Sequence, residues 1–294
     1  MNRYVFFILL LLAATAFFTS CESNASAPAT SEPAAPALTA PSFINPNWAK
    51  NGMWYDGKAE VAVYDAERVI YGKVRRFEYT FATVKEDHNR AFNVKTDDYN
   101  RDDLFGVMKV NMFARIETDN YPYHFLTSAF FPAEDPYYLY KLTNGSQEWC
   151  GNTFKEFLRT PEGIAYTWHS YWDGQGDGNA KLEAQTVFED QLPYTLRALN
   201  FAEGLRFTLP LRPSEINSKA LTPALTETAG EVSSATFSFE GKEMPAWKVT
   251  LKGKGGDTVY LFDKTYPNTF LSMQAPDGRK MTLKSVRRWA YWVS

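Results

Sequence analysis

Cysteine and histidine are scarce in this chain of 294 residues, which has two cysteines and three histidines. Two cysteines cannot build the disulfide framework of a small exported scaffold, so the fold must rely on a hydrophobic core. The histidines, His88, His124 and His169, stand far apart, and none has a second histidine at the spacing of zinc ligands. We therefore expect no metal site, and we interpret His88, which lies among charged residues, as solvated.

An excess of basic residues is missing as well. The chain carries 31 Lys and Arg against 34 Asp and Glu, a formal net charge of −3. No basic stripe results, which argues against nucleic acid as a partner. The sequence also lacks a phosphate-binding loop, a dinucleotide-binding fingerprint and a Gly-x-Ser-x-Gly elbow. We expect no cofactor.

One long apolar run is present, over residues 4–18. A membrane-spanning helix needs about 20 apolar residues, so this run is too short to span comfortably. A short apolar run followed by small residues is typical of a secretory signal, and here it leads to Cys21. We expect residues 1–20 to be a lipoprotein signal peptide and Cys21 to be lipidated, with palmitate among its acyl chains. The alternative is a secreted protein cleaved near Ala16 or Ser20.

Residues 21–42 consist mainly of Ala, Pro, Ser and Thr. Such a composition cannot bury enough apolar surface to offset the chain entropy of folding. We expect a disordered tether at 21–42, which holds a single β-rich domain of residues 43–294 away from a membrane. Glu22, not Asp, follows Cys21, and the resemblance to sorted lipoproteins then implies the outer membrane of the cell envelope.

Apolar and polar residues alternate with a period of two through most of 43–294, a pattern that indicates β-strands. Turn signals such as Asn144-Gly145, Glu240-Gly241 and Pro276-Asp277-Gly278 separate the alternating segments. The pattern predicts a mainly β fold, an antiparallel curved sheet or half-barrel, with one main helix near 184–200. The expected strands are 59–64, 77–82, 108–118, 123–131, 137–142, 154–158, 164–172, 205–211, 235–239, 246–251, 258–262, 269–274 and 280–286.

Aromatic residues are abundant, with 22 Phe, 17 Tyr and 8 Trp. A β-rich core accounts for many of them, because aromatic rings pack well on pleated surfaces. The more specific interpretation is a cleft whose aromatic rings stack on sugars or accommodate lipid chains. The rings that we expect to line such a cleft are Phe77, Tyr79, Phe81, Tyr166 and Trp168.

Cys150 is the candidate for chemistry, since it follows Gln147-Glu148-Trp149 and precedes a glycine. A lone cysteine can act as a nucleophile when a histidine activates it, and His169 or His124 is the candidate base. A free cysteine is, however, also one of the most commonly buried residues and then serves packing alone. We therefore assign no catalytic residue, and we keep a cysteine hydrolase as an alternative.

The run Gln147-Glu148-Trp149-Cys150-Gly151 is distinctive. With several other short runs, it resembles an uncharacterised lipoprotein family of Gram-negative bacteria, and the similarity covers most of residues 45–290. The family has no established activity, so the resemblance implies a lipoprotein and not a reaction. The other matching runs are Asn45-Pro46-Asn47-Trp48, Trp54–Glu60, Arg68–Lys73, Tyr121-Pro122-Tyr123 and His169–Gly174.

Members of this family are sometimes labelled septum formation inhibitor Maf. Maf proteins are α/β nucleotide pyrophosphatases with a Ser-x-Arg-Arg motif near the N-terminus. Here Ser285-Val286-Arg287-Arg288 mimics that motif at the opposite end of a β-rich chain. We treat the label as a misassignment.

An anchor, a tether and a curved aromatic-rich sheet together resemble periplasmic lipid-handling and lipoprotein-carrier modules. The leading hypothesis is a non-enzymatic, membrane-anchored module that binds an apolar ligand or has a structural role. The alternatives are an envelope hydrolase that uses Cys150 with His169 or His124, and a carbohydrate-binding surface. The leading hypothesis predicts a large apolar pocket without clustered titratable groups.

Overall fold

A computed structural model of the protein describes residues 38–293, which form sixteen strands in one sheet. The strand order is β10-β11-β12-β13-β14-β15-β16-β1-β2-β4-β5-β6-β7-β8-β9, and β3 pairs with β2. Strands β10 and β11 run parallel, whereas the other pairs along the sheet are antiparallel. The predicted mainly β, antiparallel fold is confirmed.

The strands range in length from the two residues of β3 and β10 to the 17 residues of β2. They are β1 Ala59–Ile70, β2 Lys73–Asn89, β3 Val94–Lys95, β4 Leu104–Ile116, β5 Tyr123–Pro132, β6 Lys141–Glu148, β7 Gly151–Thr160, β8 Gly163–Ser170, β9 Asp177–Leu182, β10 Val187–Phe188, β11 Arg206–Arg212, β12 Thr226–Phe239, β13 Lys242–Leu251, β14 Thr258–Asp263, β15 Phe270–Gln274 and β16 Lys280–Trp289.

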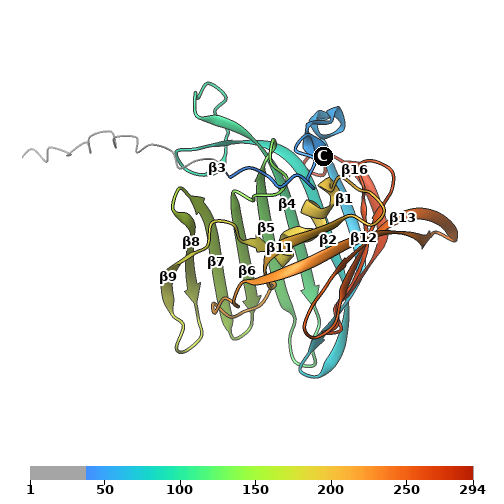
Figure 1. The fold of residues 1–294 in the computed structure, drawn as a ribbon. Coiled ribbons are helices and arrows are strands. Elements are labelled where there is room, and N and C mark those ends of the chain that lie inside the picture. The colour runs from blue at the N-terminus through green and yellow to red at the C-terminus, as the bar shows by residue number, and fades with distance from the viewer. Residues whose placement is uncertain (1–37, 294) are drawn as a thin grey trace, which may run out of the picture. The chain divides into compact units, whose positions relative to one another are not determined.

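The sheet curves but does not close, because β9 and β10 stand at its two ends and are not paired with each other. In Figure 1, β4 to β9 form one wall, the C-terminal strands turn toward it, and a short helical segment lies on the concave side. The predicted curved sheet or half-barrel therefore describes this part of the chain.

The helix expected near 184–200 is much shorter in the structure. Three one-turn pieces, η3 Glu189–Gln191, α1 Leu192–Thr195 and η4 Leu196–Ala198, form the helical part. Val187 and Phe188 precede them and pair with β11 instead of joining a helix. Pro193 fits the start of α1, because the first turn of a helix leaves its backbone N–H groups unpaired. We call residues 187–199 the plug.

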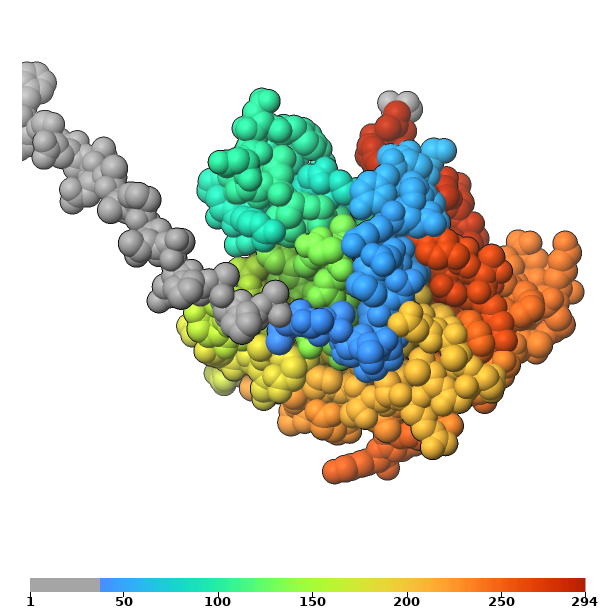
Figure 2. Space-filling model, turned by 45° about the horizontal axis from the view of Figure 1, so that its top comes forward, coloured from blue at the N-terminus to red at the C-terminus, as the bar shows by residue number. Residues whose placement is uncertain are grey.

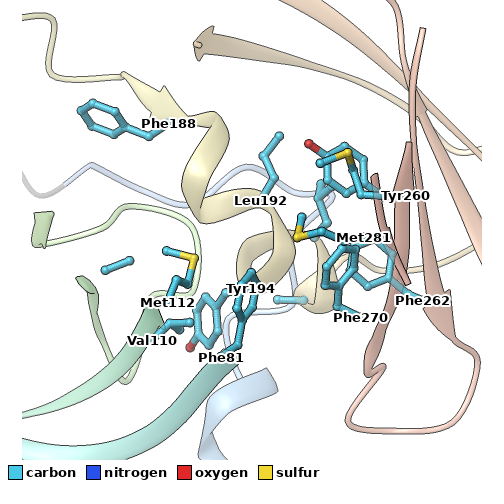
Figure 3. Close-up of a cluster of buried hydrophobic side chains, with 14 of the residues drawn as sticks. Phe81, Val110, Met112, Phe188, Leu192, Tyr194, Tyr260, Phe262, Phe270 and Met281 are labelled. Atoms are coloured by element: carbon cyan, nitrogen blue, oxygen red, sulfur yellow. The ribbon is translucent and has the colours of Figure 1, made fainter. Parts of the chain in front are cut away.

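The plug fills the concave side of the sheet and is buried on nearly all sides. Leu192, Leu196 and Ala198 have no exposed surface, and Tyr194 is buried as well. Figure 3 shows Tyr194 beside Phe81 of β2, while Leu192 points toward the C-terminal strands that carry Tyr260. Because almost every side chain of the plug is covered, polar ones included, the segment lacks the one-sided pattern that marks a surface helix.

The first described residues cover one end of the plug. Ile44 forms a β-bridge with Leu199 of the plug, and the 3-10 turns η1 Trp48–Lys50 and η2 Gly52–Tyr55 follow. The indole rings of Trp48 and Trp54 are buried. Figure 2 shows this segment, in blue, at the surface between the strands of the first half and the C-terminal residues.

Turn chemistry sets the register of the long hairpins. Tyr71 and Gly72, at φ 54° and 71°, form a tight turn between β1 and β2, and Glu240 and Gly241 do the same between β12 and β13. Asn144-Gly145, which we predicted as a turn, lies inside β6 instead. Asn144 is buried there, and its side-chain amide donates a 2.7 Å hydrogen bond to the Thr127 hydroxyl.

Three expectations lie outside the described residues: the signal peptide at 1–20, the lipidation of Cys21, and most of the tether at 21–42. Residues Ala35–Ser294 form one compact unit, and the sheet, the plug and the core all belong to it. Within residues 38–293, none of the helices has the length and apolar character to cross a bilayer.

Candidate ligand-binding site

An apolar cleft lies between the plug and the concave face of the sheet. Its volume is about 640 Å³ with the open mouth included, of which about 60 Å³ is wide enough for the centre of a water molecule. The smaller of these two volumes is well below the roughly 300–1,000 Å³ that ligand pockets span. The cleft therefore has room for a slender group only. Its apolar wall consists of Ala66, Phe77, Tyr79, Phe81, Met112, Ala114, Ile116, Phe125, Pro193, Ile216, Tyr260, Met273 and Met281.

Charged residues border the mouth of this cleft. Four of them come from residues 67–68 and 279–280. These two stretches lie side by side because the pairing of β1 with β16 places Glu67 opposite Lys280. The charged and polar residues at the mouth are Glu67, Arg68, Glu189, Asp190, Ser214, Arg279 and Lys280. The predicted pocket is therefore apolar inside, but it does carry clustered titratable groups at its opening, which the leading hypothesis did not predict.

A second hollow continues outward from the mouth and is lined by Arg68, Glu189, Ser214 and Arg279, among others. The same four residues line the apolar cleft, so the two spaces share a border. Arg279 donates to Glu189 at 2.7 Å and to Asp277 at 2.6 Å. Burial raises the pKa of the Glu189 carboxyl, and the nearby Arg279 cation opposes that effect.

A buried ion pair fastens the irregular segment 213–225 over the plug. Lys155 of β7 lies 3.3 Å from a carboxylate oxygen of Glu215 and donates to the Lys219 carbonyl at 3.0 Å. Both charged side chains are fully buried. Burial raises the pKa of Glu215 to about 7 and lowers the pKa of Lys155. Asp190 of the plug accepts a 2.7 Å hydrogen bond from the Glu215 backbone N–H and so joins the two segments.

Three of the five aromatic rings expected at the cleft line it: Phe77, Tyr79 and Phe81, all on β2. Tyr166 and Trp168 of β8 do not line the cleft. The Tyr166 ring stacks on Phe157 at 4.4 Å, and its hydroxyl donates to the Ala220 carbonyl. The alternating pattern of β8 shows that Tyr166 and Trp168 share one face of the strand. It does not show whether the cleft or another segment lies against that part of the sheet.

Cys150 lies in the exposed turn between β6 and β7. Its sulfur is 2.9 Å from the Tyr121 hydroxyl, and this contact raises the pKa of Tyr121 to about 12. His124 is exposed on β5, and the exposed His169 ring on β8 lies 3.2 Å from Asp177. Among the hydrogen bonds of the described residues, neither histidine is a partner of Cys150. Within residues 38–293, the geometry therefore pairs neither histidine with the Cys150 thiol.

Replacing Cys150 by Ser should change the free energy of unfolding by less than about 0.5 kcal/mol, because the side chain is exposed and no core contact is lost. Urea unfolding of the two proteins measures the difference. A loss above about 2 kcal/mol would show that the thiol has a structural role. Since the thiol is exposed, alkylation of the folded protein is expected and does not by itself indicate a hydrolase.

His88 is not solvated, contrary to our interpretation of the sequence. Its side chain is 2% exposed and is surrounded by the rings of Phe105, Phe130 and Tyr140. Its Nε2 atom lies 3.5 Å from Glu86. Within the described chain, no group of three or more His, Cys, Asp or Glu side chains is placed to hold a metal ion.

The comparisons with known proteins give little. No family model and no curated protein matches the chain. Among solved structures, the beta-barrel-like protein of the domain of unknown function DUF1849 from Brucella abortus is similar at 10% sequence identity, with a TM-score of 0.41. The similarity covers 79% of this chain and 98% of that one, and at this distance it says nothing about function.

Proposed function

We propose that this protein is a membrane-anchored module of the cell envelope that binds a slender apolar ligand without transforming it. The observation that supports the proposal is the cleft between the plug and β2, β4 and β5, with its apolar wall and open mouth. The anchor, the tether and the outer-membrane location are part of the proposal, and they rest on the sequence of residues 1–42.

The wall of the cleft is suited to an alkyl chain. Met112, Met273 and Met281 line it, and methionine side chains are flexible enough to repack around an irregular apolar group. Each methylene group that leaves water contributes about 0.8 kcal/mol, so a chain of ten gains roughly 8 kcal/mol before the entropy loss of binding. A ligand of this kind needs no catalytic group in the cleft.

The first test is to fill the cleft with a side chain. Ala114 of β4 lines it and is almost fully buried, and a phenyl ring at this position occupies the space of the ligand. In the unit of residues 35–294, Ala114→Phe should weaken the binding of decanol at least about tenfold, measured by displacement of a fluorescent apolar probe. Native mass spectrometry of the unit from a bacterial extract should show a bound molecule of lipid size.

Ala180→Phe is the matched control, since Ala180 is exposed on the edge strand β9. Thermal unfolding establishes that both variants are folded. Equal binding by Ala114→Phe and the unsubstituted protein would place the ligand elsewhere, and no binding of decanol or of any co-purified lipid would refute the proposed function.

A carbohydrate-binding surface is the second candidate, and one observation favours it. Trp149 is 79% exposed, and its ring stacks on Tyr121 with an angle of 14° between the planes, which leaves one face of the indole free. Binding of envelope oligosaccharides that Trp149→Ala abolishes, with decanol binding unchanged, would support this alternative.

A further inference from the structure

We propose that the ligand is an anionic amphiphile, with its alkyl chain in the cleft and its carboxylate or phosphate head group held by Arg68 and the Tyr79 hydroxyl at the mouth. This inference rests on the proposed function and names the chemical class of its ligand. Both residues line the cleft, and Arg68 also lines the outer hollow.

Arg68 is a cation without an anionic partner. Among the described residues, no side chain or backbone group forms a hydrogen bond or an ion pair with its guanidinium group, which packs 5.6 Å from the centre of the Phe125 ring. Burial of this group lowers its pKa, which reflects the loss of water around a positive charge. A ligand anion at this position would supply the bidentate partner that a guanidinium group prefers.

Tyr79 supplies a second donor in the same wall. Its side chain is 8% exposed, and its hydroxyl is buried without a hydrogen-bond partner. Buried polar groups are nearly always paired, so an unpaired hydroxyl at a cleft wall indicates a missing partner. Arg68 and Tyr79 line the same cleft from the neighbouring strands β1 and β2, so the two donors border the space that one head group would occupy.

The carboxylates around the mouth already have donors. Glu67 accepts from Arg76 at 2.9 Å, and Glu189 accepts from Arg279 at 2.7 Å. Asp190 accepts from the Ser214 hydroxyl at 2.6 Å. A cationic ligand would have to displace one of these donors. An anionic ligand, in contrast, meets the Arg68 cation and the Tyr79 hydroxyl, which have no acceptor among the described residues.

Two kinds of molecule share this chemistry, a fatty acid and a single-chain lipid phosphate. The experiment compares four ligands with the same ten-carbon chain: decanoate, decyl phosphate, decanol and decyltrimethylammonium. Each displaces a fluorescent apolar probe from the unit of residues 35–294. We expect at least one of the two anions to bind about tenfold or more tightly than decanol, and the cation to bind more weakly than decanol. The stronger of the two anions identifies the head group.

Arg68→Gln should reduce the preference for the anion over decanol to within about threefold, and Arg68→Lys should retain part of it. Tyr79→Phe should reduce the preference several-fold, because it removes one donor and keeps the ring. Arg115→Gln makes the same change of charge on the exposed face of β4, where Arg115 pairs with Glu117, and should keep the full preference. Thermal unfolding establishes that each variant is folded.

The outcomes separate the inference from the proposed function. Tight binding of decanol with no preference for either anion overturns the anionic head group and leaves the apolar cleft as the site. An anion preference that survives in Arg68→Gln also overturns the inference, because it assigns the head group to other residues. If the folded protein binds none of the four ligands, both proposals are wrong.

Discussion

Replacing Arg197 by Ala is expected to lower the free energy of unfolding by about 3–5 kcal/mol, the largest effect of any substitution considered for this protein. Arg197 of the plug and Glu60 of β1 are 3% and 5% exposed. Two hydrogen bonds of 2.7 and 2.9 Å join the guanidinium group to the carboxylate. The substitution leaves the carboxylate buried without a counter-ion, and a buried, unpaired charge is strongly destabilising.

The loss of stability should depend on the burial of the ion pair. Arg206→Ala removes one member of the exposed pair Arg206–Glu231 and should change the stability by less than about 1 kcal/mol. The double variant Arg197→Met with Glu60→Leu should recover much of the loss, because it removes both charges together. Urea unfolding followed by tryptophan fluorescence measures all of these variants. A loss for Arg197→Ala no larger than that for Arg206→Ala would contradict the assignment.

The fold was largely predictable because its main signals are local. The two-residue period over segments such as 123–131 and 246–251 predicted strands there, and β5 and β13 contain these segments. Glu240-Gly241 signalled a tight turn, which the positive φ angles of both residues confirm. An antiparallel sheet built from neighbouring hairpins needs little information beyond these signals.

Asn144-Gly145 shows where a local signal fails. The pair is typical of a turn, but the buried Asn144 side chain finds a partner in Thr127 of the neighbouring strand. Tertiary hydrogen bonding thus overrides the turn preference of the dipeptide. His88 is a similar case. The charged residues around it in the sequence give no sign that its side chain is buried among aromatic rings.

The candidate site depended on contacts between distant segments, and sequence patterns could not supply them. Phe77, Tyr79 and Phe81 share one face of β2 by simple alternation. The charged mouth forms only because β1 pairs with the last strand, β16, and because the plug lies against both. The pairing of the first strand of the chain with its last strand leaves no trace in the sequence of either strand alone. For that reason no sequence signal singled out Arg68 or Arg279.

The stability of the protein should decrease as the pH rises from about 4.5 to about 7, through the buried carboxyl of Glu215. Burial raises the pKa of Glu215 from 4.5 to about 7 in the folded state. A raised carboxyl pKa means that the folded state holds the proton more tightly than the unfolded state. The stabilisation is therefore fully present below pH 4.5 and is lost as the pH rises through 7. At about 1.4 kcal/mol per pKa unit, the loss is on the order of 3 kcal/mol.

Glu215→Gln should remove this pH dependence, because the amide has the shape of the protonated carboxyl and does not titrate. The measurement is the difference in unfolding free energy between the variant and the original protein from pH 4 to pH 8, which cancels the titration of the groups that do not interact with Glu215. Burial also lowers the pKa of Lys155 from 10.5. Loss of its proton in the folded state favours folding as the pH rises, which is opposite in sign to the effect of Glu215. Glu231→Gln, an exposed control on β12, should leave the profile unchanged. A difference curve for Glu215→Gln that is flat across the range would show that Glu215 ionises as freely in the folded protein as in the unfolded chain, which would contradict the prediction.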